Sequence, residues 1–209
     1  MRSLDPTAAR QRAVELAERS ERAILGVTGA PAAGKSTYAE KLVAELSADG
    51  LKVALVPMDG YHLAQSALEA LGLADVKGAP HTFDAAGFVA LLRRLKQRED
   101  TVWAPRFDRQ LEDSIAASIG VGPEIDLIVT EGNYLLLDQA PWTTGRQLID
   151  EVWYIDLPND VRHARLEARH RRFGRSPEEA HARTHGSDER NAQLIASTKP
   201  AADAVLHLN

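Results

Sequence analysis

A glycine-rich segment at residues 29–37 limits the folds open to this chain more than any other feature. It reads GAPAAGKST and matches the pattern G-x-x-x-x-G-K-[ST] without a gap. Glycines let backbone amides turn closely around phosphate oxygens, provided that a buried strand precedes the pattern and a helix follows it. Here an apolar run at 23–27 precedes it, and apolar residues at helical spacing follow from 35 to 46. The segment therefore predicts a strand, a phosphate-binding loop and a helix in direct succession.

Short apolar runs alternate with helical patterns along the chain. We predict buried strands at 23–27, 51–56, 126–130, 151–155 and 203–208, and a short strand at 101–103. Helices are predicted at 7–20, 35–46, 63–72, 85–97, 159–172 and 187–197. This alternation indicates a parallel sheet with helices on both faces, in which ligands bind at the carboxyl ends of the strands. We therefore predict an α/β fold of the phosphate-loop (P-loop) NTPase type, formed by a single domain over residues 1–209.

The composition excludes several classes of function. The 209 residues contain no cysteine, which rules out disulfides and thiolate metal sites. The formal net charge of −5 argues against a nucleic-acid-binding protein, which is usually basic. No apolar run approaches the roughly 20 residues that span a bilayer, and the first residues lack the apolar stretch of a secretory signal. We therefore expect a cytoplasmic protein without a nucleic-acid partner or membrane insertion, whereas no heptad repeat indicates an oligomeric state.

Two acidic residues follow predicted strands directly. Asp59 comes after the second strand, in the sequence Pro-Met-Asp-Gly, and Glu131 ends the most apolar strand. Both are expected at the edge of the sheet where the phosphate loop lies. A kinase needs one carboxylate that orients and deprotonates the accepting hydroxyl, and another that holds magnesium or its water. We assign the first role to Asp59 and the second to Glu131 with Ser36, while Lys35 would reach the β- and γ-phosphates.

Arginines are concentrated between residues 162 and 190. Four recur at a spacing of three, four and three residues, which places them on one face of a helix. They are Arg162, Arg165, Arg169 and Arg172. No acidic residue lies four positions before the last three, so salt bridges within the helix explain the stripe poorly, and an external polyphosphate explains it better. We expect residues 159–190 to form a lid that moves through the polar stretch between Gly174 and Gly186, with Arg175 and Arg183 as further candidates.

Seven segments occur in an order that resembles one family of kinases. They are GAPAAGKST, PMDGYH, KGAPHTFD at 77–84, APRFDR at 104–109, VTEGNYLLL at 129–137, RLEARH at 165–170 and DERNAQLI at 188–195. Together they resemble the uridine kinase, phosphoribulokinase and bacterial pantothenate kinase superfamily of P-loop kinases, over residues 22–208. Within it, the chain is most similar to the bacterial branch labelled fructose-transport-system kinase or fructokinase-like.

The resemblance implies Mg-ATP as the phosphoryl donor and roles for particular residues. Catalysis is assigned to Asp59 as the base, with Lys35, Arg165 and Arg169. The ATP site comprises Gly29, Ala30, Pro31, Ala32, Ala33, Gly34, Lys35, Ser36 and Thr37, and Mg²⁺ is assigned to Ser36 and Glu131. The acceptor site comprises Asp59, Tyr61, His62, Arg106, Asp108 and Glu131. For Arg106 and Asp108 a salt bridge within the loop is an equal alternative, and for His62 a local hydrogen bond is.

The sequence thus predicts a kinase that moves the γ-phosphoryl group of Mg-ATP to a hydroxyl of a small metabolite. A sugar of the fructose type or a nucleoside is the preferred acceptor. A pantothenate-type kinase, and a non-catalytic nucleotide-binding regulator linked to transport, are the alternatives. A GTPase is disfavoured because guanine specificity usually needs N/T-K-x-D, and the nearest segment, Thr198-Lys199-Pro200-Ala201, lacks the aspartate.

Overall fold

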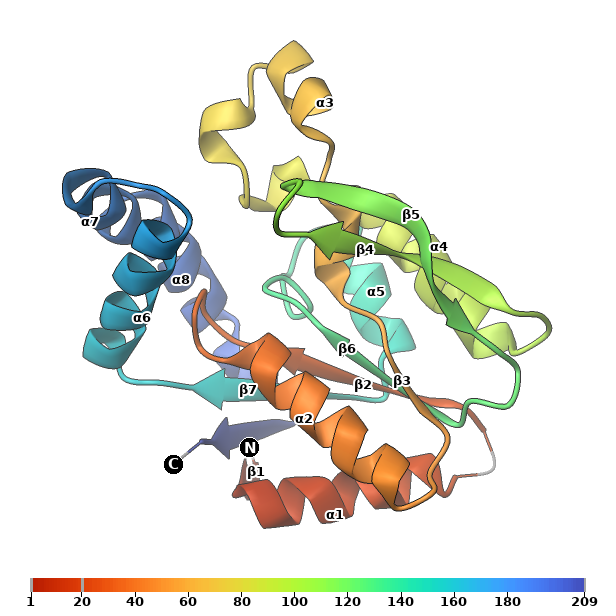
Figure 1. Ribbon diagram of the computed structural model, residues 1–209. Helices are drawn as coiled ribbons and strands as arrows, with labels where there is room; N and C mark the ends of the chain where they lie inside the picture. The colour runs from red at the N-terminus through yellow and green to blue at the C-terminus, as the bar shows by residue number, and fades with distance from the viewer. Residues whose placement is uncertain (1, 20, 209) are drawn as a thin grey trace.

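The structure is a computed structural model that describes residues 2–19 and 21–208. Over these residues a six-stranded sheet forms the centre, in the order β1-β8-β7-β2-β6-β3, with every neighbouring pair parallel (Figure 1). Its strands are β1 (Arg2–Leu4), β2 (Ala23–Thr28), β3 (Val53–Leu55), β6 (Leu127–Glu131), β7 (Glu151–Asp156) and β8 (Ala204–His207). The predicted α/β fold with a parallel sheet is confirmed. Met1 and Asn209 of the predicted domain, and Ser20 of the predicted helix 7–20, lie outside the described residues.

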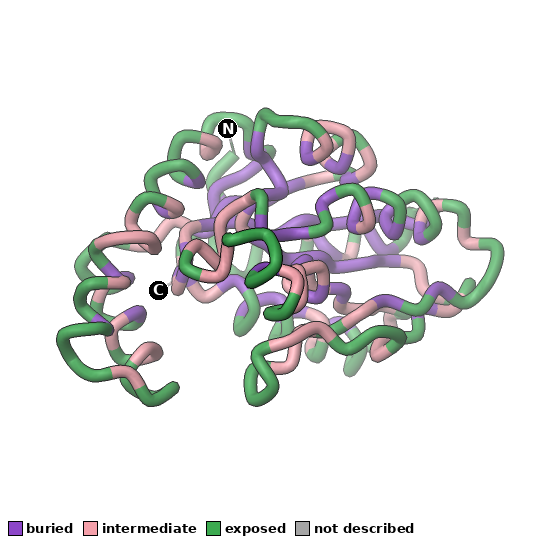
Figure 2. Tube along the Cα trace, turned by 90° about the horizontal axis from the view of Figure 1, so that it is seen from above, coloured by how far each residue is buried: buried purple, intermediate pink, exposed green. Residues whose placement is uncertain are grey.

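Helices cover both faces of the sheet, because the central strands β2 and β6 are buried on both sides. The first face is covered by α1 (Pro6–Ala17) and α2 (Lys35–Ala48), the second by α4 (Ala85–Gln97) and α5 (Trp142–Leu148). Within β2, Ile24 packs into the α4 and α5 layer, whereas Leu25 and Val27 pack into the layer of α1 and α2. Figure 2 shows the buried strands enclosed by helices whose outer sides are exposed. Burying each such side chain contributes about 1.5–3 kcal/mol, which makes this double layer the main stabilising feature.

Two groups of elements rise from the sheet on either side of the phosphate loop (Figure 1). One group consists of α6 (Asn159–Arg172), α7 (Pro177–His185) and α8 (Ser187–Ser197). The other holds α3 (Gln65–Ala70) and an antiparallel hairpin of β4 (Val102–Asp108) and β5 (Asp113–Val121). Short 3-10 turns lie at Met58–Tyr61, Ala74–Val76, Pro80–Thr82 and Lys199–Ala201. No described helix is long and apolar enough to cross a membrane.

The polar stretch between Gly174 and Gly186, for which no helix was predicted, contains α7 at Pro177–His185. Ser176 caps this helix: its hydroxyl accepts from the Glu179 amide, and the Glu179 carboxylate accepts from the Ser176 amide at 2.9 Å. This reciprocal pair is a capping box, and Pro177 is the first helical residue. The sequence Ser-Pro-Glu-Glu at 176–179 is therefore a helix-start pattern. It was missed because the segment has few apolar residues to show helical spacing.

The elements β1, β5 and α5 were also not predicted. The middle of β5 is mostly exposed, so its sequence lacks the apolar alternation of a strand that faces a core. Instead β5 is defined by its pairing with β4, which extends the expected strand at 101–103 to Asp108. A strand that is held mainly by pairing with the other strand of its hairpin cannot be predicted from the hydrophobic pattern.

Arg22 joins three segments at the amino end of the sheet. Its guanidinium is buried and donates to the carbonyl oxygens of Leu95, Gly122 and Ile125 at 2.8, 2.6 and 2.8 Å. These carbonyls belong to the end of α4 and to the turn that follows β5. Because buried carbonyls need donors, this one side chain supplies them to Leu95 and Ile125, and it adds a second donor to Gly122, which also accepts from the Ile125 amide at 3.3 Å.

Replacing Arg22 by alanine should lower the free energy of unfolding by about 3 kcal/mol, since three hydrogen bonds would be lost and two carbonyls, those of Leu95 and Ile125, would lose their donor. Urea unfolding followed by circular dichroism measures the change. Arg19→Ala is the matched control: Arg19 is largely exposed and its ion pair with Asp150 is 3.8 Å long, so its loss should cost less than about 0.5 kcal/mol. Equal stability of the two variants would contradict this role.

Candidate active site

The phosphate loop connects β2 to α2 and takes its shape from its glycines. Gly29 has a φ of +153°, and a Cβ there would lie 2.8 Å from the carbonyl oxygen of Ile155. Gly34, directly before α2, has a φ of +97°, in the left-handed region that favours glycine. These two positions are the fixed glycines of the sequence pattern. The loop therefore turns tightly enough to present the free amides at the start of α2 to an anion.

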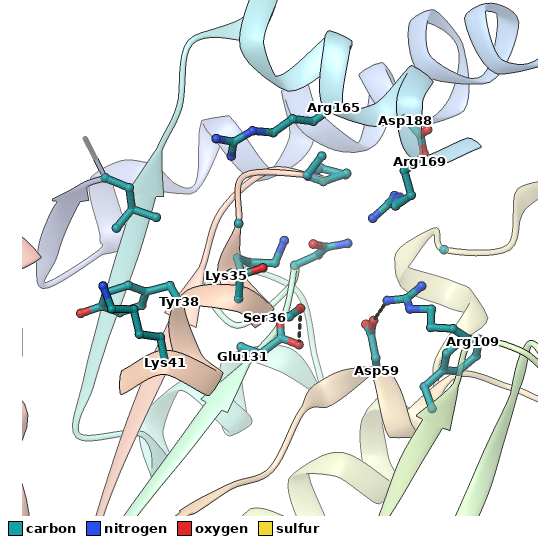
Figure 3. Close-up of a pocket in the computed structure, with 18 of the residues that line it drawn as sticks. Lys35, Ser36, Tyr38, Lys41, Asp59, Arg109, Glu131, Arg165, Arg169 and Asp188 are labelled. Carbon is teal, nitrogen blue, oxygen red and sulfur yellow. Dashed lines mark hydrogen bonds and ion pairs between the residues drawn. The ribbon is translucent and has the colours of Figure 1, made fainter. Parts of the chain in front are cut away.

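A cavity of about 1420 Å³ opens above this loop. Ligand pockets are usually about 300–1000 Å³, so this one has room for a nucleotide and a second small molecule together. It is lined by the phosphate loop, by residues that follow β3 and β6, by the β4–β5 hairpin and by α6. Figure 3 shows side chains from these elements pointing into the same space.

Lys35 and Glu131 are buried beneath the cavity. The Lys35 ammonium donates to the carbonyl oxygen of Ala30 at 3.1 Å, and burial lowers its pKa. The hydroxyl of Ser36 donates to Oε1 of Glu131 at 3.0 Å (Figure 3). Burial, and then the charge of Asp59, raise the pKa of Glu131 to about 7. A hydroxyl and a carboxylate side by side are oxygen ligands of the kind that Mg²⁺ prefers, so these two residues fit the predicted metal site.

Asp59 lies on the opposite side of the cavity, in the 3-10 turn after β3. Its Oδ2 accepts a hydrogen bond from Nη2 of Arg109 at 2.7 Å (Figure 3). The Arg109 guanidinium also stacks over Phe107, 5.2 Å from the ring centroid, and the Lys77 ammonium lies 5.6 Å from the same ring. Two cations therefore flank one aromatic ring beside the candidate base.

Arg165 and Arg169 project from α6 into the cavity from above (Figure 3). Burial, and then the charge of Arg109, lower the pKa of Arg169. Arg175 and Arg183 also line the cavity. The cavity thus presents arginines above the phosphate loop and Lys35, Ser36 and Glu131 beneath it, an arrangement suited to a polyanion accompanied by a divalent cation.

Several proteins similar to this chain have the names of kinases. One, provisionally named a uridine kinase, from Schizosaccharomyces pombe, is 33% identical over 210 residues, 93% of this chain and 87% of that protein. A crystal structure provisionally named a fructose transport system kinase, from Silicibacter sp. TM1040, is 38% identical, with a TM-score of 0.88 over 97% of this chain and 99% of that one. Pantothenate kinase from Streptomyces avermitilis is 32% identical over 136 residues, 64% of this chain and 41% of that enzyme. The chain belongs to the uridine kinase, pantothenate kinase and phosphoribulokinase family of P-loop kinases.

A family model described as Methylmalonyl Co-A mutase-associated GTPase MeaB also matches, over residues 3–65. This segment holds β1, β2, β3 and the phosphate loop, the part of the fold that phosphate-loop proteins share. It ends before the β4–β5 hairpin and before α6, so it leaves out Arg109, Arg165 and Arg169. The match therefore covers only the phosphate-loop part of the kinase, residues 3–65 of 209.

Tyr61, Arg106 and Asp108 do not lie among the described residues that line the cavity of the kinase. The Tyr61 ring packs edge-on against Phe88 at 5.6 Å, and burial raises its pKa to about 12. Arg106 is exposed, and the Asp108 carboxylate accepts from the amides of the turn that follows β4. Since neighbouring residues of a strand point to opposite faces, Phe107 faces the cavity and its two neighbours do not.

The sequence left two alternatives for His62, a local hydrogen bond and a place in the acceptor site, and the structure is compatible with both. Its Nδ1 donates to the carbonyl oxygen of Asp59 at 2.8 Å, a local hydrogen bond. Its ring also packs against Phe83 and Phe107, at centroid distances of 4.0 and 4.8 Å, and forms part of the cavity wall. Burial lowers its pKa, so the neutral ring is favoured.

Arg162 belongs to a different face of α6 from the cavity arginines, contrary to the prediction of one stripe. Only 1% of its side chain is exposed, and its guanidinium bonds to Glu189 of α8 and to Oδ1 of Asn159. Arg172 likewise does not line the cavity in the described structure. The acidic partner of Arg162 comes from another helix, which a search for acids within α6 misses.

Lys77 and Arg109 are two of the cavity residues that sequence reasoning missed. Arg109 stands in the segment APRFDR, where attention fell on Arg106 and Asp108. The alternation of β4 would have distinguished them, but β4 was predicted to end at residue 103. Lys77 lies in a loop without a periodic pattern, so no signal in the sequence placed it beside Phe107.

The raised pKa of Glu131 predicts that the unliganded kinase loses stability as the pH rises. Its pKa is 4.5 ordinarily and about 7 in the folded state, so the protonated carboxyl favours folding fully below pH 4.5 and no longer above pH 7. In urea unfolding without nucleotide or magnesium, wild type should lose up to about 3 kcal/mol more between pH 5 and pH 8 than Glu131→Gln. The exposed Glu40→Gln on α2 should follow wild type; a Glu131→Gln profile parallel to wild type would refute the shift.

Proposed function

We propose that this kinase transfers the γ-phosphoryl group of Mg-ATP to a hydroxyl of a small metabolite. The observation that carries the proposal is the position of Asp59, across one cavity from Lys35 and the phosphate loop (Figure 3). A carboxylate that faces the phosphates can orient a hydroxyl for attack and accept its proton. The size of the cavity, which exceeds that of an ordinary single-ligand pocket, supports binding of both substrates at once.

In the proposed reaction each group has one role. Backbone amides of residues 29–37 and the Lys35 ammonium bind the phosphates, and Arg165 and Arg169 neutralise charge on the transferred group. Ser36 and Glu131 would hold Mg²⁺, directly or through water, and the ion would neutralise charge that develops on the phosphates. Asp59 takes the proton from the acceptor hydroxyl. A bond forms between the oxygen of that hydroxyl and the γ-phosphorus. The bond from the γ-phosphorus to the β-phosphate oxygen breaks, and ADP leaves.

Residues 159–190, which include α6 and α7, act as a lid in this proposal. Arg165, Arg169, Arg175 and Arg183 all reach the cavity from this segment, so closure would bring positive charge onto the polyphosphate and exclude water. Gly174, with a φ of +89° and open space around it, supplies a connection between α6 and α7 that can bend.

Arg109 occupies the position that the acceptor needs. Its hydrogen bond to Oδ2 of Asp59 engages the oxygen that would accept the hydroxyl proton. Half of the Arg109 side chain is exposed, so it can move away at little cost when a hydroxyl takes its place. The acceptor hydroxyl would thus bind to Asp59 in the same step in which Arg109 leaves it.

A sugar of the fructose type or a nucleoside is the acceptor that we prefer. The names of the relatives from Silicibacter sp. and Schizosaccharomyces pombe support these two classes. A pantothenate-type acceptor, which carries a carboxylate, is the alternative. Lys77 and Arg109 beside Phe107 favour it, because an anionic group could bind between them and draw Arg109 away from Asp59.

The acceptor is identified by ADP release from Mg-ATP in the presence of matched neutral and anionic compounds. Pantothenol with pantothenate, glycerol with glycerate, and ribose with ribose 5-phosphate form pairs that differ in charge; fructose, uridine and cytidine complete the panel. We expect stimulation by fructose or a nucleoside. A preference for the anionic member of a pair would support the alternative, and ATP binding without transfer to any acceptor would indicate a regulator.

Asp59→Asn should retain ATP affinity but reduce kcat by about 10²–10⁴-fold, the usual effect of removing a general base. Calorimetric titration with ATP and steady-state ADP release measure the two effects. Asp75→Asn is the matched control, because Asp75 is exposed and is not among the described residues that line the cavity. Near-normal turnover by Asp59→Asn would exclude Asp59 as the base.

A further inference from the structure

Two histidines of the lid lie on a side that the phosphotransfer site does not use. On α7, His181 and His185 are four residues apart and therefore share one face of the helix. Glu167 of α6 lies opposite them. The described residues that line the nucleotide cavity include none of these three. The cluster therefore needs an explanation of its own.

The three side chains converge on one point. Oε1 of Glu167 lies 2.9 Å from Nδ1 of His181 and 3.6 Å from Nε2 of His185, and the three atoms are all within 4.8 Å of one another. Around a tetrahedral zinc ion, bonds of about 2.0–2.2 Å place neighbouring ligand atoms about 3.3 Å apart. The two shorter separations bracket this value, so small movements of exposed side chains would suffice for coordination.

The surroundings help to orient the ligands. The His163 ring packs edge-on against His185 at 4.6 Å, while its Nε2 lies 2.9 Å from Oε2 of Glu189 and is thus already engaged. Nη2 of Arg171 approaches the second oxygen of Glu167 at 3.6 Å, which leaves Oε1 for the histidines. Glu167 is partly buried, whereas His181 and His185 are exposed enough for an ion to enter from solvent.

We propose that Glu167, His181 and His185 form a Zn²⁺ site that joins α6 to α7. Two imidazoles and one carboxylate are borderline ligands that suit this ion, and water would complete a four-coordinate shell. The site is separate from the Mg²⁺ site beneath the phosphate loop, which is built from oxygen ligands.

Such a link matters because α7 is held weakly. Of its described side chains, Ala180 and Thr184 are the buried ones, and both are small. Yet α7 also carries Arg183 to the nucleotide cavity. An ion bound between α6 and α7 would restrict the position of Arg183 without touching the substrates.

Zinc titration of the full chain, treated with chelator and free of any histidine tag, tests the site. Competition with a chromophoric chelator should show one Zn²⁺ per chain. His181→Asn combined with His185→Asn should weaken zinc binding at least about tenfold. Removing a residue that only hydrogen-bonds to a metal ligand already weakens metal affinity by about that factor. His81→Asn is the matched control, since His81 is exposed and lies outside the lid.

Hydrogen exchange supplies a second readout. Zinc should slow exchange of the amides of α7 in wild type and in His81→Asn, but not in the double variant, whose fold and ATP binding should be unchanged. Glu167→Gln should weaken zinc binding in the same way. Absence of a zinc complex, or zinc binding that the double substitution leaves unchanged, overturns the proposal.

Discussion

The contact between the phosphate loop and β7 is the constraint on which the rest of the site depends. Because a side chain at Gly29 would collide with the carbonyl oxygen of Ile155, only glycine lets the chain leave β2 beside its neighbour and turn at once into α2. The loop is thereby held at the carboxyl edge of the sheet. In a parallel sheet the other strands end at that edge too, which brings Glu131 and Asp59 to the loop from β6 and from the turn after β3.

That convergence has an electrostatic cost in the unliganded protein. Burial disfavours charge on both Lys35 and Glu131, and each charge is partly offset by the other. Asp59 favours the charge of Lys35 but disfavours that of Glu131. A polyanion above Lys35 and a divalent cation beside Glu131 would supply the missing opposite charges. The buried charges are therefore best satisfied when both ligands of the proposed reaction are present.

The sequence predicted what depends on local pattern and missed what depends on pairing across the fold. The strand–loop–helix unit around Lys35 follows from glycine spacing and hydrophobic periodicity, and the parallel sheet from continuous apolar runs. Arg109 escaped prediction because the length of β4 is set by its pairing with β5, and strand length decides which side chains of 106–109 face the cavity. Arg162 was misplaced because its acidic partner, Glu189, lies on a different helix.

The helix α6 shows how one periodic segment serves several parts of the molecule. Its arginines look like a single stripe in the sequence, but residues three and four apart define neighbouring faces of a helix. One face points into the cavity, the next packs against the protein, and the third meets α7. The pairs on these faces are Arg165 with Arg169, Arg162 with Leu166, and His163 with Glu167. Because Arg162 ties the middle face to α8, the rotation of α6 about its axis is set by a buried ion pair. That rotation in turn directs Arg165 and Arg169 into the cavity and Glu167 toward the histidines of α7.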